Sequence, residues 1–155
     1  MPSVRRNEFC TPYLMPGDDL IDAMIMAAQR GVDVRIMMPG IPDKKLIFRM
    51  SHSFYQELLM GGVKIYEYIP GFLHAKSCVI DGKIATVGSV NLDHRSLFLQ
   101  FENNSLFYRS SVAEEVMADF LATLERCREI VPYNQTQYAL RLAFDGILRI
   151  FAPLC

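Results

Sequence analysis

The stretch "VDVRIMM", from Val32 to Met38, constrains the fold of this chain more than any other. Its β-branched and apolar residues are typical of a strand that is buried on both faces of a sheet, which is the usual setting of parallel strands. Parallel strands are joined by crossover connections, and these are usually helices. The chain is therefore expected to alternate strands with helices.

Helical segments do flank this strand. The first covers about 18–30, with Asp18 or Asp19 as its cap and Gly31 as its stop, and the second covers about 44–60. Both have the length of an ordinary globular helix. The strand is thus expected to lie between two helices along the chain.

The remaining segments complete the pattern. Residues 8–14, 63–69 and 98–108 have the composition of strands, and Ser111 and Glu114 have capping-box spacing at the start of a helix to about Ile130. The sequence therefore predicts an α/β domain, a layered fold with a mixed β-sheet and helices packed on its faces.

The end of the chain reads differently from the rest. We expect residues 8–131 to form the domain and residues 132–155 to form an amphipathic C-terminal tail, because Arg141, Asp145 and Arg149 recur every four residues on an otherwise apolar helix. Such a helix could lie in a membrane interface, dock on a partner half, or dock on the core of its own domain. The sequence leaves these three possibilities open.

Composition limits the kinds of partner. The chain has 155 residues, 51% of them apolar, and a net charge of −1, so no nucleic-acid partner is expected. Four cysteines lie far apart, without zinc spacing, and are expected to be reduced thiols; no metal and no cofactor is expected. No uncharged run approaches the ~18 residues of a spanning helix, so the chain is expected to have no transmembrane helix of its own.

One hairpin concentrates polar groups. In "FLHAKSCVIDGKIATVGSVN", residues 72–91, the Asp81-Gly82 pair predicts a type I′ turn with residue 80 opposite residue 83, and hence His74 opposite Ser89. With Gly82-Lys83 at the centre, His74 would face Asn91 instead. Side chains alternate with period two, so both registers predict one face with the four polar residues His74, Lys76, Ser89 and Asn91.

An imidazole, an ammonium, a hydroxyl and an amide on one face suit a phosphate group. Gly88 beside them allows a ligand or another backbone to come close. Asp81 is separated from His74 by roughly 23 Å of strand, at ~3.3 Å per residue. We interpret Asp81 as a turn residue and not as a catalyst.

The residues His74-x-Lys76, four residues to Asp81, then six to Gly88-Ser89-x-Asn91, resemble the HKD signature of the phospholipase D superfamily. "RGVDVRIMMPG", "GVKIYEYIPGFLHAK" and "RIFAPL" are similar to the C-terminal half of bacterial cardiolipin synthases. The resemblance covers nearly the whole chain except for "MPSVRRN". It implies a phospholipase D-like fold.

The resemblance also implies a chemistry. Members of this superfamily exchange phosphodiesters without a metal through a phosphohistidine, at a site where two HKD motifs meet. His74 would be one catalytic histidine, as nucleophile or as acid/base, and Lys76 and Asn91 would bind the phosphoryl oxygens. Ser89 would donate a hydroxyl, and Glu102 would match the carboxylate that fixes the tautomer of the histidine.

For cardiolipin synthases, the implied reaction joins two phosphatidylglycerol molecules into cardiolipin and glycerol, in a membrane-associated enzyme of the bacterial cell membrane. This chain has a single H-x-K, because His52 and His94 lack that spacing and are expected to be ordinary surface or cap residues. The expected partners are thus a phospholipid, a membrane surface, and an N-terminal HKD half or a second copy. A homodimeric phosphodiesterase or nuclease, or an inactive fragment that binds a partner, stays open as an alternative.

Overall fold

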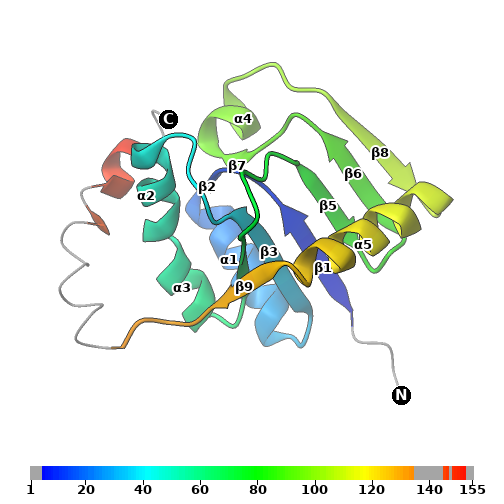
Figure 1. Cartoon of the computed structure of the whole chain (residues 1–155), viewed down its shortest axis with the longest axis horizontal. Coiled ribbons are helices and arrows are strands. Elements are labelled where there is room, and N and C mark those ends of the chain that lie inside the picture. The colour runs from blue at the N-terminus through cyan, green and yellow to red at the C-terminus, as the bar shows by residue number, and fades with distance from the viewer. Residues whose placement is uncertain (1–4, 135–144, 147, 153–155) are drawn as a thin grey trace.

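The computed structural model describes residues 5–134, 145, 146 and 148–152. Its strands are β1 (Arg6–Cys10), β2 (Leu14–Met15), β3 (Asp33–Pro39), β4 (Lys64–Tyr68), β5 (Ser77–Ile80), β6 (Ile84–Gly88), β7 (Leu92–Asp93), β8 (Asn104–Tyr108) and β9 (Cys127–Ile130). Its helices are α1 (Asp18–Gln29), α2 (Lys45–Ser53), α3 (Tyr55–Met60), α4 (His94–Phe98) and α5 (Ser111–Leu124). Figure 1 shows their arrangement.

A mixed seven-stranded sheet organises the domain, in the order β8-β6-β5-β1-β3-β4-β9. Strands β1, β3 and β4 are parallel, whereas β5, β6 and β8 pair antiparallel on one side and β9 pairs antiparallel on the other. β2 and β7 form a separate parallel pair. The predicted α/β class, the mixed sheet and the buried strand at 32–38 are confirmed.

Helices cover the two faces of the sheet unequally. Val34, Ile36 and Met38 of β3 pack with residues of α1, α2 and α3 in the largest core cluster. Met37, which points the other way, packs with Cys10 and with Phe120 of α5. Figure 1 shows α5 crossing the sheet from the end of β8 toward β9. The parallel strands are therefore buried between two helical layers.

The helix expected over 44–60 is two helices that meet at Phe54. The Ser53 hydroxyl donates to the Met50 carbonyl over 2.6 Å, and Arg149 Nη2 donates to the Ser53 carbonyl over 2.6 Å. Both bonds draw helix groups away from a continuous ladder, which explains the break.

The strand expected over 98–108 is wrong in its first half. Asp93 caps α4, its Oδ1 accepting from Ser96 N over 2.7 Å, so Phe98 ends a short helix and the strand begins at Asn104. The strand expected over 8–14 is likewise divided into β1 and β2.

Two predicted helix ends also differ. Gly17, and not Asp18 or Asp19, is the N-cap of α1, and no capping box forms at Ser111, because Ser110 is the N-cap of α5. The last residues assigned to the helix, 127–130, form β9 instead. Pairing with the exposed edge of β4 outweighs local helix preference there.

His52 was expected at the surface or as a cap, and the structure corrects this. Its ring is half-buried and stacks on Tyr55, and its Nε2 lies 2.7 Å from Glu67 Oε1 while its Nδ1 lies 2.7 Å from the Phe48 carbonyl. Arg128 donates to the other oxygen of Glu67 over 2.8 Å. Burial raises the pKa of Glu67, but the bonds from His52 and Arg128 hold it below its usual value. The group joins α2, β4 and β9.

Part of the C-terminal tail is described. Leu148 and Ala152 pack into the largest core cluster, and Arg149 Nη1 donates to Glu57 over 2.6 Å. This segment therefore docks on its own domain, which was one of the three possibilities. Arg141, the first residue of the predicted charged stripe, and the apolar residues within 135–144 lie outside the described residues.

Glu8 is a buried carboxylate without a visible partner. It lies in β1 opposite Arg35 of β3 and Val79 of β5, and neither carboxylate oxygen has a hydrogen-bond partner among the described residues. Burial raises its pKa, although the charges of Arg35 and Arg6 oppose this. Its charged form is therefore disfavoured in the folded state.

We expect Glu8→Gln to stabilise the protein at neutral pH. Because the folded-state pKa of Glu8 is raised, its favourable contribution is present below the unfolded pKa and is lost as the pH rises through the folded value. The amide of Gln does not titrate and avoids this loss, so at pH 7.5 Tm should rise by about 2–4 °C, the shift for about 1 kcal/mol in a chain of this size. Thermal unfolding from pH 4 to 8 measures this, with the exposed Glu125→Gln as control. An equal or lower Tm at pH 7.5 would contradict the argument.

Candidate active site

The hairpin turn forms as predicted, but its register does not. Asp81 and Gly82 both have positive φ, at 52° and 63°, and Lys83 N donates to the Ile80 carbonyl over 3.0 Å. However, Ile80 pairs with Ile84, so Lys83 is an additional loop residue. Both expected registers are therefore wrong, and neither Ser89 nor Asn91 is a strand partner of His74.

The candidate catalytic residues lie just outside the pleat. β5 begins at Ser77, so His74 and Lys76 belong to the extended segment that precedes it. Gly88 N donates to the Lys76 carbonyl over 3.2 Å, which keeps this segment beside the end of β6. The path of the segment, and not strand alternation, therefore decides how the side chains meet.

A cavity of about 660 Å³ forms where these segments meet α5. Its walls include His74, Lys76, Gly88 and Ser89, and they are completed by apolar and acidic residues of α5, among them Val112, Val116, Glu115 and Asp119. Three of the four polar residues predicted on one face thus line one cavity. The fourth, Asn91, does not.

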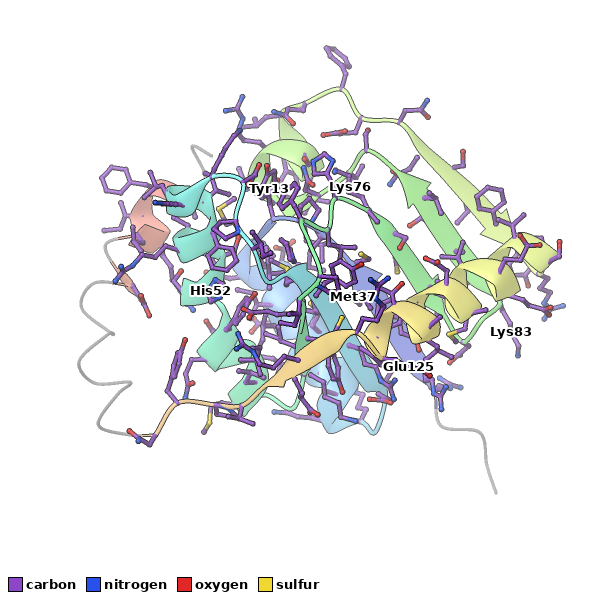
Figure 2. All side chains as sticks on the ribbon, in the orientation of Figure 1. Tyr13, Met37, His52, Lys76, Lys83 and Glu125 are labelled. Atoms are coloured by element: carbon purple, nitrogen blue, oxygen red, sulfur yellow. The ribbon has the colours of Figure 1, made fainter. Side chains whose placement is uncertain are left out.

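Lys76 contacts His74 directly. Its Nζ lies 3.2 Å from His74 Nε2 and donates to the His74 carbonyl over 2.9 Å. Because an ammonium has only donors, Nε2 accepts in this contact, which leaves the ring proton on Nδ1. Burial lowers the pKa of Lys76, and the carboxylates of Glu102 and Asp93 act in the opposite direction. Figure 2 labels Lys76.

Ser89 connects the cavity to Glu102. Its hydroxyl donates to Glu102 Oε2 and accepts from Asn103 N over 2.9 Å. In the structure, the carboxylate of Glu102 is bonded to Ser89. A bond from Glu102 to His74 stays a prediction. The negative charge of Glu102 still acts on Lys76, where it opposes the lowering of the pKa by burial.

Asn91 lines a neighbouring cavity of about 180 Å³. Its Nδ2 donates to Ser96 Oγ over 3.2 Å, and its buried Oδ1 has no hydrogen-bond partner among the described residues. Ser89 lines the first cavity and Asn91, two positions later in the chain, lines the second, so the two cavities are neighbours.

The second cavity contains two cations that sequence reasoning missed, Lys44 and Arg95. They are separated by 50 residues, and no motif connects them. Only the position of α4 against the loop before α2 brings them together. No pattern in the sequence could have predicted this pair.

Gly88 allows a close approach, as expected, and the approaching group is backbone. A Cβ at this position would overlap the Asn103 carbonyl oxygen and the Asn104 backbone. The chain at 103–104 therefore packs directly on Gly88, which holds Ser89 next to Glu102.

These features can be compared with known proteins. Residues 3–124 match the family model described as "Cardiolipin synthase, PLD-like domain". The chain belongs to this phospholipase D-like family. It is 40% identical over 146 residues to a cardiolipin synthase of Geobacillus sp. (strain WCH70), a match that covers 93% of this chain and 29% of the relative. It is 45% identical over 145 residues to cardiolipin synthase 2 of Bacillus anthracis, covering 93% of this chain and 28% of that protein. The chain thus spans less than a third of the relatives it matches.

Solved structures confirm the phospholipase D-like fold. Nuc from Salmonella typhimurium, a phospholipase D family member, aligns with a TM-score of 0.70 at 18% identity, over 81% of this chain and 82% of that chain. Phosphatidylserine synthase from Haemophilus influenzae aligns with a TM-score of 0.66 at 15% identity, over 97% of this chain and 42% of that one. The recognition of the superfamily and of the cardiolipin synthase relatives is confirmed.

Two further predictions concern the turn residue Asp81 and membrane-spanning helices. Asp81 lies in the turn, where its Oδ1 accepts from Arg6 N over 2.8 Å, so the side chain also attaches the hairpin to β1. None of the helices in the described part of the chain is long and apolar enough to cross a membrane.

We expect Asp81→Asn to fold and act like the wild type, whereas Asp81→Ala should lose stability. The Asn carbonyl oxygen can still accept from Arg6 N, and Asn tolerates positive φ. Ala offers no acceptor and is strained at φ 52°, so about 1–2 kcal/mol of unfolding free energy should be lost. Urea unfolding of both variants measures this. Loss of activity by Asp81→Asn at normal stability would show that the turn interpretation is wrong.

Proposed function

We propose that this chain supplies one of two HKD motifs of a metal-independent phosphatidyl transferase, which joins two phosphatidylglycerol molecules into cardiolipin and glycerol. One observation carries the proposal. In a chain of the cardiolipin synthase family, His74 Nε2 faces the Lys76 ammonium at the wall of a cavity that Ser89 also lines.

The proposed reaction has two steps. In the first, one histidine attacks phosphorus through its ring nitrogen, and the bond from phosphorus to the leaving glycerol oxygen breaks as the second histidine protonates that oxygen. In the second, the hydroxyl of the acceptor lipid attacks the phosphohistidine and gives its proton to the second histidine, and the P–N bond breaks. His74 takes one of these roles, as nucleophile or as acid/base.

The other candidate residues stabilise charge in this scheme. Lys76 neutralises a phosphoryl oxygen, and Asn91 donates to another after giving up its bond to Ser96. Ser89 offers its hydroxyl at the same wall, and the charge of Glu102, which is bonded to it, opposes the lowering of the Lys76 pKa by burial. Asp81 and Gly88 have structural roles only: the Asp81 side chain attaches the turn to β1, and Gly88 lets the backbone at 103–104 pack closely.

A second histidine must come from outside the cavity wall. Among the described residues, His52 is engaged by Glu67 and Phe48, and His94 lies in α4 with its ring 4.9 Å from that of Phe98. Neither lines the cavity with His74. An N-terminal HKD half or a second copy of this chain would provide the missing imidazole.

The antiparallel side of the sheet offers a surface for that partner. Leu106 and Tyr108 of the edge strand β8 are exposed, at 69% and 63%. An exposed apolar strand at a sheet edge favours association with another chain. We propose that the partner domain covers this strand, and that the assembly acts at the bacterial cell membrane.

A second function rests on the size of one structural neighbour. The phospholipase D family member Nuc shares the fold of this chain over 82% of its own length. This favours, as the alternative, a homodimer with a single type of motif that cleaves soluble phosphodiesters. An inactive chain that only binds a partner is the remaining possibility.

We expect His74→Ala to abolish phosphatidyl transfer and leave the fold intact, because the imidazole has a chemical role and its ring is not in the core. The loss should be about 10²-fold or more. Cardiolipin formation from phosphatidylglycerol vesicles measures it in the assembly with a co-expressed N-terminal HKD half, at matched circular dichroism and with Asp81→Asn as a control that keeps its activity. A variant that retains more than about a tenth of the wild-type rate would contradict the assignment.

We also expect a monomer of this chain to show no transfer, however well it folds. Activity should appear when an N-terminal HKD half from a cardiolipin synthase relative is co-expressed. Light scattering on the assayed sample determines the mass of the active species. Turnover by a verified monomer would refute the need for two histidines, and cleavage of soluble diesters by a homodimer would favour the alternative function.

A further inference from the structure

The connection from α4 to β8 exposes an unusual concentration of large apolar side chains. Leu97, Phe98, Leu99 and Phe101, here called the apolar turn, occupy four of five successive positions. Leu99 is 67% exposed, and the side chain of Phe101 is fully exposed. Figure 1 shows this connection running along the outer edge of the molecule. These side chains therefore project from the domain.

The backbone holds the apolar turn in this position. Asp93 caps the start of α4, and the amides of Leu99 and Gln100 both donate to the Arg95 carbonyl over 2.9 Å at its end. Glu102, directly after the turn, is bonded to Ser89. These bonds anchor the backbone of the segment at both ends.

Two cations without partners lie beside this turn. The side chains of Arg95 and Lys44 line the cavity next to Asn91, and no hydrogen bond or ion pair joins either one to the described part of the chain. The carboxylates nearby form other hydrogen bonds: Asp93 accepts from Ser96 N, and Asp43 accepts from Tyr13 over 2.5 Å and from the Lys44 amide over 2.6 Å. Burial raises the pKa of Asp43, but these bonds and the charge of Lys44 hold it below its usual value. Neither the ammonium nor the guanidinium forms a direct ion pair among the described residues, so both head groups can contact an external anion.

Apolar side chains that project beside unpaired cations match the chemistry of an anionic lipid surface, where acyl chains lie beneath phosphate groups. We propose that the apolar turn, with Arg95 and Lys44, docks this domain on an anionic phospholipid bilayer. The proposal rests on the proposed function, because it supposes that the substrate is a lipid in a membrane. A protein partner with a flat surface would fit the exposed β8 strand better than the apolar turn, because Phe101 projects from that turn.

Docking in this way would place the candidate site at its substrate. Asn91 donates to Ser96 within α4, and Ser89 is bonded to the residue that follows Phe101. An inserted turn reaches about 5–10 Å into the boundary of headgroups and acyl chains. The cavity beside Asn91, to which Arg95 of α4 contributes, would then lie at the level of the lipid phosphates. A phosphodiester could enter it without leaving the bilayer.

Vesicle co-sedimentation of the whole chain tests this, with phosphatidylcholine alone and with an equal mixture of phosphatidylcholine and phosphatidylglycerol. Leu99→Ser combined with Phe101→Ser should weaken binding to the mixed vesicles at least about tenfold, since two large apolar side chains no longer insert. Arg95→Gln should weaken it about fivefold, and only with the anionic lipid. Met60→Ser combined with Val131→Ser removes side chains that are 71% and 72% exposed elsewhere, and should bind like the wild type.

His74→Ala separates this proposal from the proposed function, because it should bind vesicles normally while failing in transfer. Light scattering and circular dichroism accompany each variant. Unchanged vesicle binding by the double variant of the apolar turn would overturn the proposal. So would a change of its mass with no change in vesicle binding, since the turn would then be a contact between protein copies.

Discussion

The pairing of β1 with β5 is the constraint on which the rest of the site depends. β1 lies between the parallel strand β3 and the antiparallel strand β5, so it joins the buried half of the sheet to the hairpin. Cys10 at its end pairs with Ser77, which fixes where β5 begins. His74 and Lys76 therefore lie outside the sheet, immediately before β5, and beside the end of the core strand β1.

A second close contact completes the site on the opposite side of the hairpin. The backbone at 103–104 packs on Gly88 so tightly that no side chain fits there. This contact places Glu102 against Ser89, and its charge opposes the effect of burial on the pKa of Lys76. A phosphate site needs a cation that stays protonated in a partly buried position, and the carboxylate near Lys76 serves that need.

The exposed surfaces divide by shape and chemistry. The β8 strand presents exposed apolar side chains at a sheet edge, whereas the turn after α4 presents projecting ones beside Lys44 and Arg95. We propose a protein partner that brings a second imidazole for the first surface and a lipid bilayer for the second. This division would let the same domain complete its catalytic site and approach a lipid substrate at the same time. The docking of Leu148 and Arg149 against α2 and α3 occupies a different part of the molecule.

The sequence by itself determined the fold class, the buried strand at 32–38, the turn at Asp81-Gly82 and the family, because each depends on local pattern or on residues at fixed spacing. It also indicated which residues gather near His74, with the exception of Asn91, which lies in the adjoining cavity. Only the tertiary structure decided the hairpin register, since the additional loop residue Lys83 depends on how β5 and β6 meet β1 and β8. It likewise decided that 127–130 is a strand, that His52 bonds Glu67, and that Lys44 and Arg95 share a cavity. Each of these joins residues far apart in the chain, and no local preference records which distant groups will lie within contact distance.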